Sequence, residues 1–152
     1  SRIIKLIVKG DIVMGTHYAK AKWEGTLKDG TGKFNFTGYE GPFNFRSRFE
    51  DGAETNPEEL IGAAQAGCFS IILAALMRKK DITPSSRETI ARGELGQDER
   101  PKITSITLDC EAVVPGLSEE DFNTLAAEAK AKCPISRLTT GTDVFLNAKL
   151  LS

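Results

Sequence analysis

Apolar and polar residues alternate with a period of two in three segments of the chain, and this pattern predicts β-strands. The first segment covers residues 19–49, where residues 28–30 (Lys-Asp-Gly) give a turn signal between strands. The second is centred on residues 106–112, and the third covers residues 144–150. Cys110 alternates with apolar residues in the second segment, so it is expected on the core face of its strand.

Phenylalanines continue the period of two at the end of the first segment, at Phe43, Phe45 and Phe49. Arg46 and Arg48 occupy alternate positions in the same stretch. The pattern therefore predicts a strand on which both guanidinium groups share one face.

A long apolar stretch at residues 60–77 predicts the main helix. Asn56 is a good N-cap, Pro57 fits the first helical position, and the basic residues 78–80 complement the C-terminal end of the helix dipole. The stretch is apolar on nearly every face, which predicts a helix buried all round. It is shorter than the about 20 apolar residues that span a membrane and contains Gln65, so a core helix is favoured.

A second helix is expected from Ser118 to about Lys132, and Cys133-Pro134 ends it. Strands, a long helix, strands, a helix and a final strand thus follow one another. This order predicts an α+β fold and not an alternating, doubly wound one.

The 152 residues suit one domain with a substantial core. The 20 basic and 21 acidic residues nearly cancel, so no electrostatic argument favours a nucleic acid or an anionic membrane. With one histidine, His17, and three widely spaced cysteines, we expect neither a disulfide framework nor a metal or other cofactor. Without a secretory pattern, the expected location is the cytoplasm.

The first residues of the chain need a separate interpretation. Residues 1–13 are either a leader placed ahead of a native start at Met14 or a genuine first strand. A single domain is expected to cover residues 14–152.

The residues alone leave two alternatives open for each of two cysteines. Cys68 lies inside the long helix, where it could be a functional thiol or could merely pack, as free cysteines often do. Cys133 lies at a helix break. Pro134 could start a short new helix and leave the thiol at its N-terminus, which favours a thiolate, or the thiol could sit at a frayed, solvent-exposed end.

Several blocks of the sequence resemble the OsmC/Ohr family, and the likeness covers roughly residues 19–150. The most specific blocks are residues 55–64 (Thr-Asn-Pro-Glu-Glu-Leu-Ile-Gly-Ala-Ala), 66–70 (Ala-Gly-Cys-Phe-Ser) and 129–136 (Ala-Lys-Ala-Lys-Cys-Pro-Ile-Ser). Residues 19–25, 48–52 (Arg-Phe-Glu-Asp-Gly) and 114–116 add to them. The stretches Trp-Glu-Gly and Arg-Phe-Glu-Asp-Gly look more like the OsmC branch than the Ohr branch.

The resemblance implies an OsmC-like fold, with antiparallel sheets around a long buried central helix, in an intertwined homodimer. It also implies a thiol-dependent peroxidase that reduces organic hydroperoxides to alcohols. Cys68 would attack the peroxide, and Cys133 would resolve the resulting sulfenate as a disulfide. An external dithiol, for which the resemblance suggests a lipoyl type, would reduce that disulfide.

The resemblance further implies that an arginine and a glutamate organise the site. Glu58 matches the family glutamate ten residues before the reactive cysteine, and Arg48 matches the family arginine. Arg46 is a second candidate, because this chain carries an extra Arg-Ser pair. Gln65 stands where many OsmC members have histidine, and the implied mechanism gives that position no role.

Physical chemistry explains why such a site would need a cation. Lowering a cysteine pKa from about 8.5 to about 6 takes roughly 3.4 kcal/mol of preferential thiolate stabilisation. The helix dipole fades within the first turn, and burial acts in the opposite direction. A guanidinium held by a carboxylate is therefore the expected source.

The spacing of Glu58 and Cys68 bears on assembly. Ten residues of one helix correspond to about 15 Å of rise, so the two side chains of one chain lie far apart. Two such helices packed antiparallel across a two-fold axis would bring Glu58 of one chain near Cys68 of the other.

Two other classes of function stay open at this point. The cysteines could form a redox-sensing switch without turnover. Alternatively, the chain could be a hydrophobic-ligand binding protein with inert cysteines.

Overall fold

The computed structural model describes residues 15–152, and the expectation for residues 1–13 lies outside the described residues. The chain divides into two compact units, the first up to Glu54 and the second from Thr55 to Ser152. In chain order the elements are β1 (Lys20–Glu24), β2 (Thr31–Phe36), β3 (Tyr39–Phe43), α1 (Phe45–Phe49), α2 (Pro57–Lys79), β4 (Ser86–Gln97), β5 (Pro101–Val113), α3 (Glu119–Lys132), α4 (Pro134–Leu138) and β6 (Asp143–Leu150).

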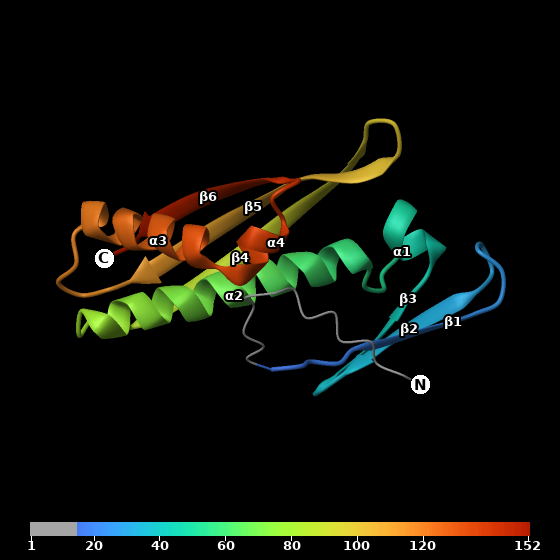
Figure 1. Ribbon diagram of the computed structural model, residues 1–152, viewed down its shortest axis with the longest axis horizontal. Helices are drawn as coiled ribbons and strands as arrows, with labels where there is room; N and C mark the ends of the chain where they lie inside the picture. The colour runs from blue at the N-terminus through green and yellow to red at the C-terminus, as the bar shows by residue number, and fades with distance from the viewer. Residues whose placement is uncertain (1–14) are drawn as a thin grey trace, which may run out of the picture. The chain divides into compact units, whose positions relative to one another are not determined.

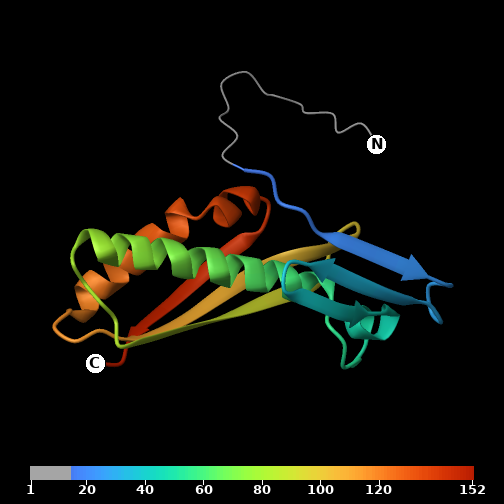
Figure 2. The ribbon, with the colours of Figure 1, turned by 90° about the horizontal axis from the view of Figure 1, so that it is seen from below.

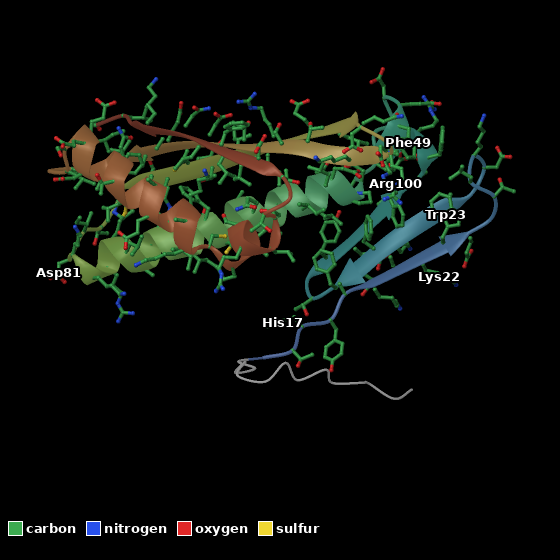
Figure 3. All side chains as sticks on the ribbon, turned by 45° about the horizontal axis from the view of Figure 1, so that its top comes forward. His17, Lys22, Trp23, Phe49, Asp81 and Arg100 are labelled. Atoms are coloured by element: carbon green, nitrogen blue, oxygen red, sulfur yellow. The ribbon has the colours of Figure 1, made fainter. Side chains whose placement is uncertain are left out.

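The first unit is built on the antiparallel sheet β1-β2-β3. The aromatic side chains that alternate along these strands lie on one face, where the Phe34 and Phe43 rings stack with centroids 4.0 Å apart and Trp23 packs at 5.7 Å from Phe43. The turn between β2 and β3 contains Gly38 at φ +72°, a backbone conformation that favours glycine. Figure 3 labels Trp23 and Lys22 on β1.

The prediction of a strand through Arg46 and Arg48 is wrong, because residues 45–49 form the short helix α1. The Asn44 side chain accepts a hydrogen bond from the Ser47 backbone at 2.8 Å, and the Ser47 hydroxyl accepts one from the Asn44 backbone at 3.0 Å. This capping box starts a helix where the period of two alone would continue a strand. On a helix, residues two positions apart point to different sides, so the two arginines do not share a face.

The second unit has two layers, in which the helices α2 and α3 cover one face of the sheet β4-β5-β6 (Figures 1 and 2). Contacts pair α2 mainly with β4 and α3 with β6. Helix α2 approaches β4 closely at Gly62, where a Cβ atom would lie 3.4 Å from Ala91 Cβ. The core between the layers holds fully buried side chains from α2, β5 and α3, among them Phe69, Leu73, Met77, Leu108, Cys110 and Phe122, and β4 and β6 add partly buried ones.

The expectation of antiparallel sheets holds for β1-β2-β3 and for the β4–β5 pair, but β6 pairs with β5 in parallel. The chain leaves β5, runs through α3 and α4 and then enters β6. Such a crossover returns the chain to the same end of the sheet, which is the geometry that parallel pairing requires. The α+β order itself is as the sequence predicted.

The prediction that α2 is buried all round needs correction, because in this chain only one side of it is covered. Its buried residues recur at helical spacing and face the rest of the second unit: Gly62, Gln65, Phe69, Leu73, Leu76 and Met77. The opposite side is apolar but exposed, and Ile71 there is 71% exposed. Among the described helices α2 alone is long and apolar enough to cross a membrane, a test that core helices also pass.

The ends of α2 follow the predicted signals. The Asn56 side chain accepts a hydrogen bond from the Glu59 backbone N–H at 2.8 Å, and Arg78 and Lys79 lie in the last turn. Asp81, labelled in Figure 3, follows the helix at φ 55°, a left-handed conformation that aspartate tolerates better than most residues.

The full burial of Leu73 on α2 predicts a strong contrast between its truncation and that of an exposed leucine elsewhere in the chain. We expect Leu73→Ala to lower the free energy of unfolding by about 2–5 kcal/mol, because it opens a cavity at a fully buried position. The matched change Leu27→Ala, at a side chain that is 64% exposed, should cost no more than about 0.5 kcal/mol. Urea unfolding followed by circular dichroism measures both, and equal losses would contradict this packing.

Candidate active site

Cys68 lies in the middle of α2, on the border between its buried and its exposed side. Its neighbours Gly67 and Phe69 are exposed and fully buried, respectively, and Cys68 itself is partly buried. The thiol is therefore packed by protein on one side and approachable on the other. This position differs from that of Cys110, whose side chain is fully enclosed in the core as predicted.

Cys133 occupies the junction between α3 and α4. Its backbone is extended, with φ −65° and ψ 124°, and Pro134 takes the first position of α4. Of the two alternatives that the sequence left open, the structure supports the new helix start and excludes the frayed, exposed end, because Cys133 is 0% exposed. Proline explains the break, since it cannot continue α3 but suits the first turn of the next helix.

The structure brings the Cys68 and Cys133 thiols into hydrogen-bond contact, although 65 residues separate them in the sequence. All three cysteines are free thiols. Burial is the largest cause that raises the pKa of the Cys68 thiol, and the contact with Cys133 acts in the same direction. The backbone N–H of Ile135, in the first turn of α4, lowers this pKa in part by donating to the sulfur.

Gln65 links α2, the helix of Cys68, to Cys133 and α4, and is the site residue to which sequence reasoning gave no role. It lies one turn before Cys68 on α2 and is fully buried. Its Nε2 donates to Ser136 Oγ at 2.7 Å and to Cys133 Sγ at 3.8 Å. Its Oε1 accepts from Thr139 Oγ1 at 3.3 Å. A polar residue inside an otherwise apolar helix is the sequence signal that could have found it, because buried amides need partners.

The two arginine candidates belong to the first unit and have different surroundings there. Arg46 is exposed and pairs with Glu50 four residues later, with 3.4 Å between Nε and Oε2. The Arg48 guanidinium carbon lies 5.3 Å from the centroid of the Phe49 ring, in cation–π geometry. Glu58 lies in the first turn of α2, on the same helix as Cys68. The grouping of Arg48 and Glu58 with Cys68 stays a prediction.

The described residues contain no cluster of three or more histidine, cysteine or acidic side chains that could hold a metal ion. The single histidine, His17, is exposed ahead of β1, as Figure 3 shows. The positive feature of the site is the pair of adjacent free thiols of Cys68 and Cys133, which can support thiol oxidation and disulfide exchange.

A family model described as OsmC-like protein matches residues 50–147, which includes both thiols and most of the second unit. The chain belongs to the OsmC-like family. The resemblance drawn from the sequence motifs is thus confirmed.

This OsmC-family chain is 40% identical over 123 residues to Peroxiredoxin OsmC of Escherichia coli, a match that covers 78% of the chain and 86% of that protein. It is 30% identical over 103 residues to an organic hydroperoxide resistance protein-like protein of Staphylococcus epidermidis, which covers 66% and 74%. The higher identity to the OsmC relative agrees with the predicted branch.

Solved structures confirm the OsmC fold. An OsmC-like protein of unknown function from Vibrio cholerae superposes with a TM-score of 0.74 at 20% identity, covering 89% of this chain and 99% of that one. The organic hydroperoxide resistance protein OhrB of Bacillus subtilis gives 0.65 at 25% identity, covering 87% and 98%.

The thiol contact predicts which disulfide forms first in this OsmC-family protein. One equivalent of diamide should link Cys68 to Cys133 and leave Cys110 reduced, because disulfide formation needs close approach and Cys110 is enclosed. Peptide mapping by mass spectrometry identifies the bond. Cys110→Ser should leave its yield unchanged, whereas a dominant disulfide that includes Cys110 would contradict the geometry.

Proposed function

We propose that this protein is a thiol-dependent peroxidase that reduces organic hydroperoxides to alcohols. The observation that carries the proposal is the contact between the partly accessible thiol of Cys68 and the buried thiol of Cys133. Relatives named peroxiredoxin and organic hydroperoxide resistance protein support the same reaction class. The site residues in this proposal are Cys68, Cys133, Arg48 and Glu58, and the reaction needs no cofactor.

The reaction begins with the Cys68 thiolate. Its sulfur attacks the outer peroxide oxygen, the O–O bond breaks, and the alkoxide leaves as an alcohol after protonation. Cys68 becomes a sulfenic acid. The Cys133 sulfur then attacks the Cys68 sulfur, so that the S–S bond forms, the S–O bond breaks and the hydroxyl leaves as water. The two electrons that reduced the peroxide come from the two thiols.

A positive charge near Cys68 is required, because the described contacts of this thiol raise its pKa on balance. We assign this role to Arg48, whose guanidinium stays ionised and can also donate to a peroxide oxygen. Glu58 would orient Arg48 through a bidentate pair. Arg46, which pairs with Glu50 in the first unit, is the second candidate.

The uncovered side of α2 favours the proposed homodimer. This side is apolar and built from small or aliphatic residues: Ile61, Ala63, Ala64, Gly67, Ile71, Ala74 and Ala75. A Cβ atom at Gly67 would meet nothing within 4 Å, so a second backbone could approach closely there. Two α2 helices packed antiparallel along this side would bring Glu58 of one protomer toward Cys68 of its partner.

An external dithiol would complete the cycle by thiol–disulfide exchange with the Cys68–Cys133 disulfide. A lipoyl-type dithiol is the proposed reductant, and the cytoplasm is the proposed location. A redox sensor would use the same thiol pair, but it would consume about one equivalent of peroxide and stop. A ligand-binding protein with inert cysteines would consume none.

We expect steady consumption of cumene hydroperoxide in the presence of excess dihydrolipoamide, and a fast first phase that Cys68→Ser abolishes. H₂O₂ should give a lower kcat/KM, because it has no organic group to bury against the apolar side chains around Cys68. Burial of such a group contributes roughly 25 cal/mol of binding free energy for each Å² of its surface removed from water. Stopped-flow measurement of peroxide loss tests this. Cys110→Ser is the matched control and should keep the fast phase, and survival of that phase in Cys68→Ser would refute the assignment.

The two arginines give a paired test of thiol activation. Arg48→Met should raise the pKa of the Cys68 thiol by more than a unit, because loss of a nearby cation disfavours the thiolate. The pH profile of the peroxide step should then shift toward alkaline pH by the same amount. Arg46→Met should shift it far less. The reverse ranking would assign the role to Arg46 instead.

A further inference from the structure

The buried amide of Gln65 faces the sulfur that must carry out the second step of the proposed reaction. An amide nitrogen has two hydrogens, and here one points to Ser136 Oγ at 2.7 Å and the other to Cys133 Sγ at 3.8 Å. Ser136 lies within α4, and Cys133 is the N-cap residue of that helix. A single side chain of α2 therefore contacts the resolving thiol and the helix that presents it.

The contact to sulfur has chemical meaning because Cys133 is fully buried. A thiolate forms with difficulty inside a protein unless donors stabilise it. Water has little access to this sulfur, so the amide N–H takes the place of a solvent donor. Since the amide is neutral, its contribution does not depend on pH.

The remaining contacts of Gln65 fix the position of α4 relative to α2. Its Oε1 accepts from Thr139 Oγ1 at 3.3 Å, a longer contact than the bond of the same hydroxyl to the Ile135 carbonyl at 2.9 Å. The tie to Ser136 is the shortest of the network. Gln65 precedes Cys68 by three residues, so both side chains point from the same part of α2 toward α4.

We propose that Gln65 is the positioning residue for the resolving step, holding Cys133 against Cys68 and donating a hydrogen bond to its thiolate. The inference rests on the proposed peroxidase function. It assigns Gln65 no part in the first step, in which Cys68 attacks the peroxide. Removal of the amide should therefore separate the two steps, with normal oxidation of Cys68 and delayed closure of the disulfide.

The principal variant is Gln65→Met, which keeps an unbranched side chain of similar length and removes the donor. We expect its peroxide consumption in a single turnover to stay within threefold of the original protein. Disulfide formation, followed by rapid acid quench and mass spectrometry, should slow at least tenfold. Cys68 should then accumulate as a dimedone-trapped sulfenic acid and, in excess peroxide, as a sulfinic acid.

Ser70→Ala is the matched control, because it removes a partly buried polar group from α2. Ser70 bonds to the Ala66 carbonyl at 2.7 Å and to Thr89 at 3.5 Å, away from α4. Both steps should keep their rates in this variant. If Ser70→Ala also slowed disulfide closure tenfold, the effect would be general loosening of α2 and the inference would be overturned.

Gln65→Glu gives a second, independent test that also serves if Gln65→Met does not fold. A protonated carboxyl can donate to sulfur, whereas an ionised one cannot and repels a thiolate. Relative to the original protein, the closure rate should therefore fall as pH rises through the titration of the introduced carboxyl. If Gln65 had a purely structural role, the ratio of the disulfide-formation rate of Gln65→Glu to that of the original protein would not change with pH.

Failure of the proposed peroxidase function can be distinguished from failure of the proposed role of Gln65. If the original protein consumes no peroxide, or Cys68→Ser consumes it as fast, the proposed function fails. If the original protein is active but Gln65→Met closes its disulfide at the normal rate, the role of Gln65 alone fails. The same holds if both steps slow together in Gln65→Met.

Discussion

The close approach of Cys68 and Cys133 is the constraint on which the proposed chemistry of the second unit depends. Two thiols from distant parts of the chain meet because α2 and α3 pack on one face of a single sheet and because α3 stops at Cys133. Had α3 continued, its next residues would have followed the helix away from this point. The proline that ends it redirects the chain into α4, and α4 closes the site over α2.

This arrangement has an electrostatic cost that the rest of the protein must offset. Burial excludes water from the resolving thiol and makes the attacking thiol harder to ionise. Two kinds of group can compensate, namely a fixed positive charge for Cys68 and neutral donors for Cys133. The second unit supplies the Gln65 amide and the first turn of α4, and Arg48 is only the proposed source of the charge.

The sequence predicted those parts of the structure that local signals determine. The N-caps Asn56 and Ser118, the core face of β5 with Cys110 and the break at Pro134 all follow from residue types at fixed spacing. The errors arose where two local signals compete or where a nonlocal effect decides the outcome. A capping box overrode the phenylalanine alternation at residues 45–49. The parallel direction of β6 depends on where a crossover lands, which periodicity does not encode.

Within the candidate site, motif resemblance identified both cysteines, but the partners of a buried polar side chain could not be read from the chain. Gln65 is 68 residues from Cys133 and 71 from Ser136, and only folding makes them neighbours. The burial of Cys133 was equally hidden, because a cysteine at a helix break can face either solvent or core. These are questions of three-dimensional packing and not of local preference.

The parallel pairing of β6 has a consequence for how the protein is made. Strand β6 leaves the ribosome after α3 and α4, and its register with β5 requires these two helices to be formed as the crossover. Cys68 is synthesised 65 residues before Cys133, so the growing chain carries an unprotected thiol until Cys133 has followed it. Contacts over such sequence distances form late in folding. The two thiols thus come into contact only when the second unit has folded. A chain that is truncated or stalled before Cys133 would hold Cys68 without its partner thiol.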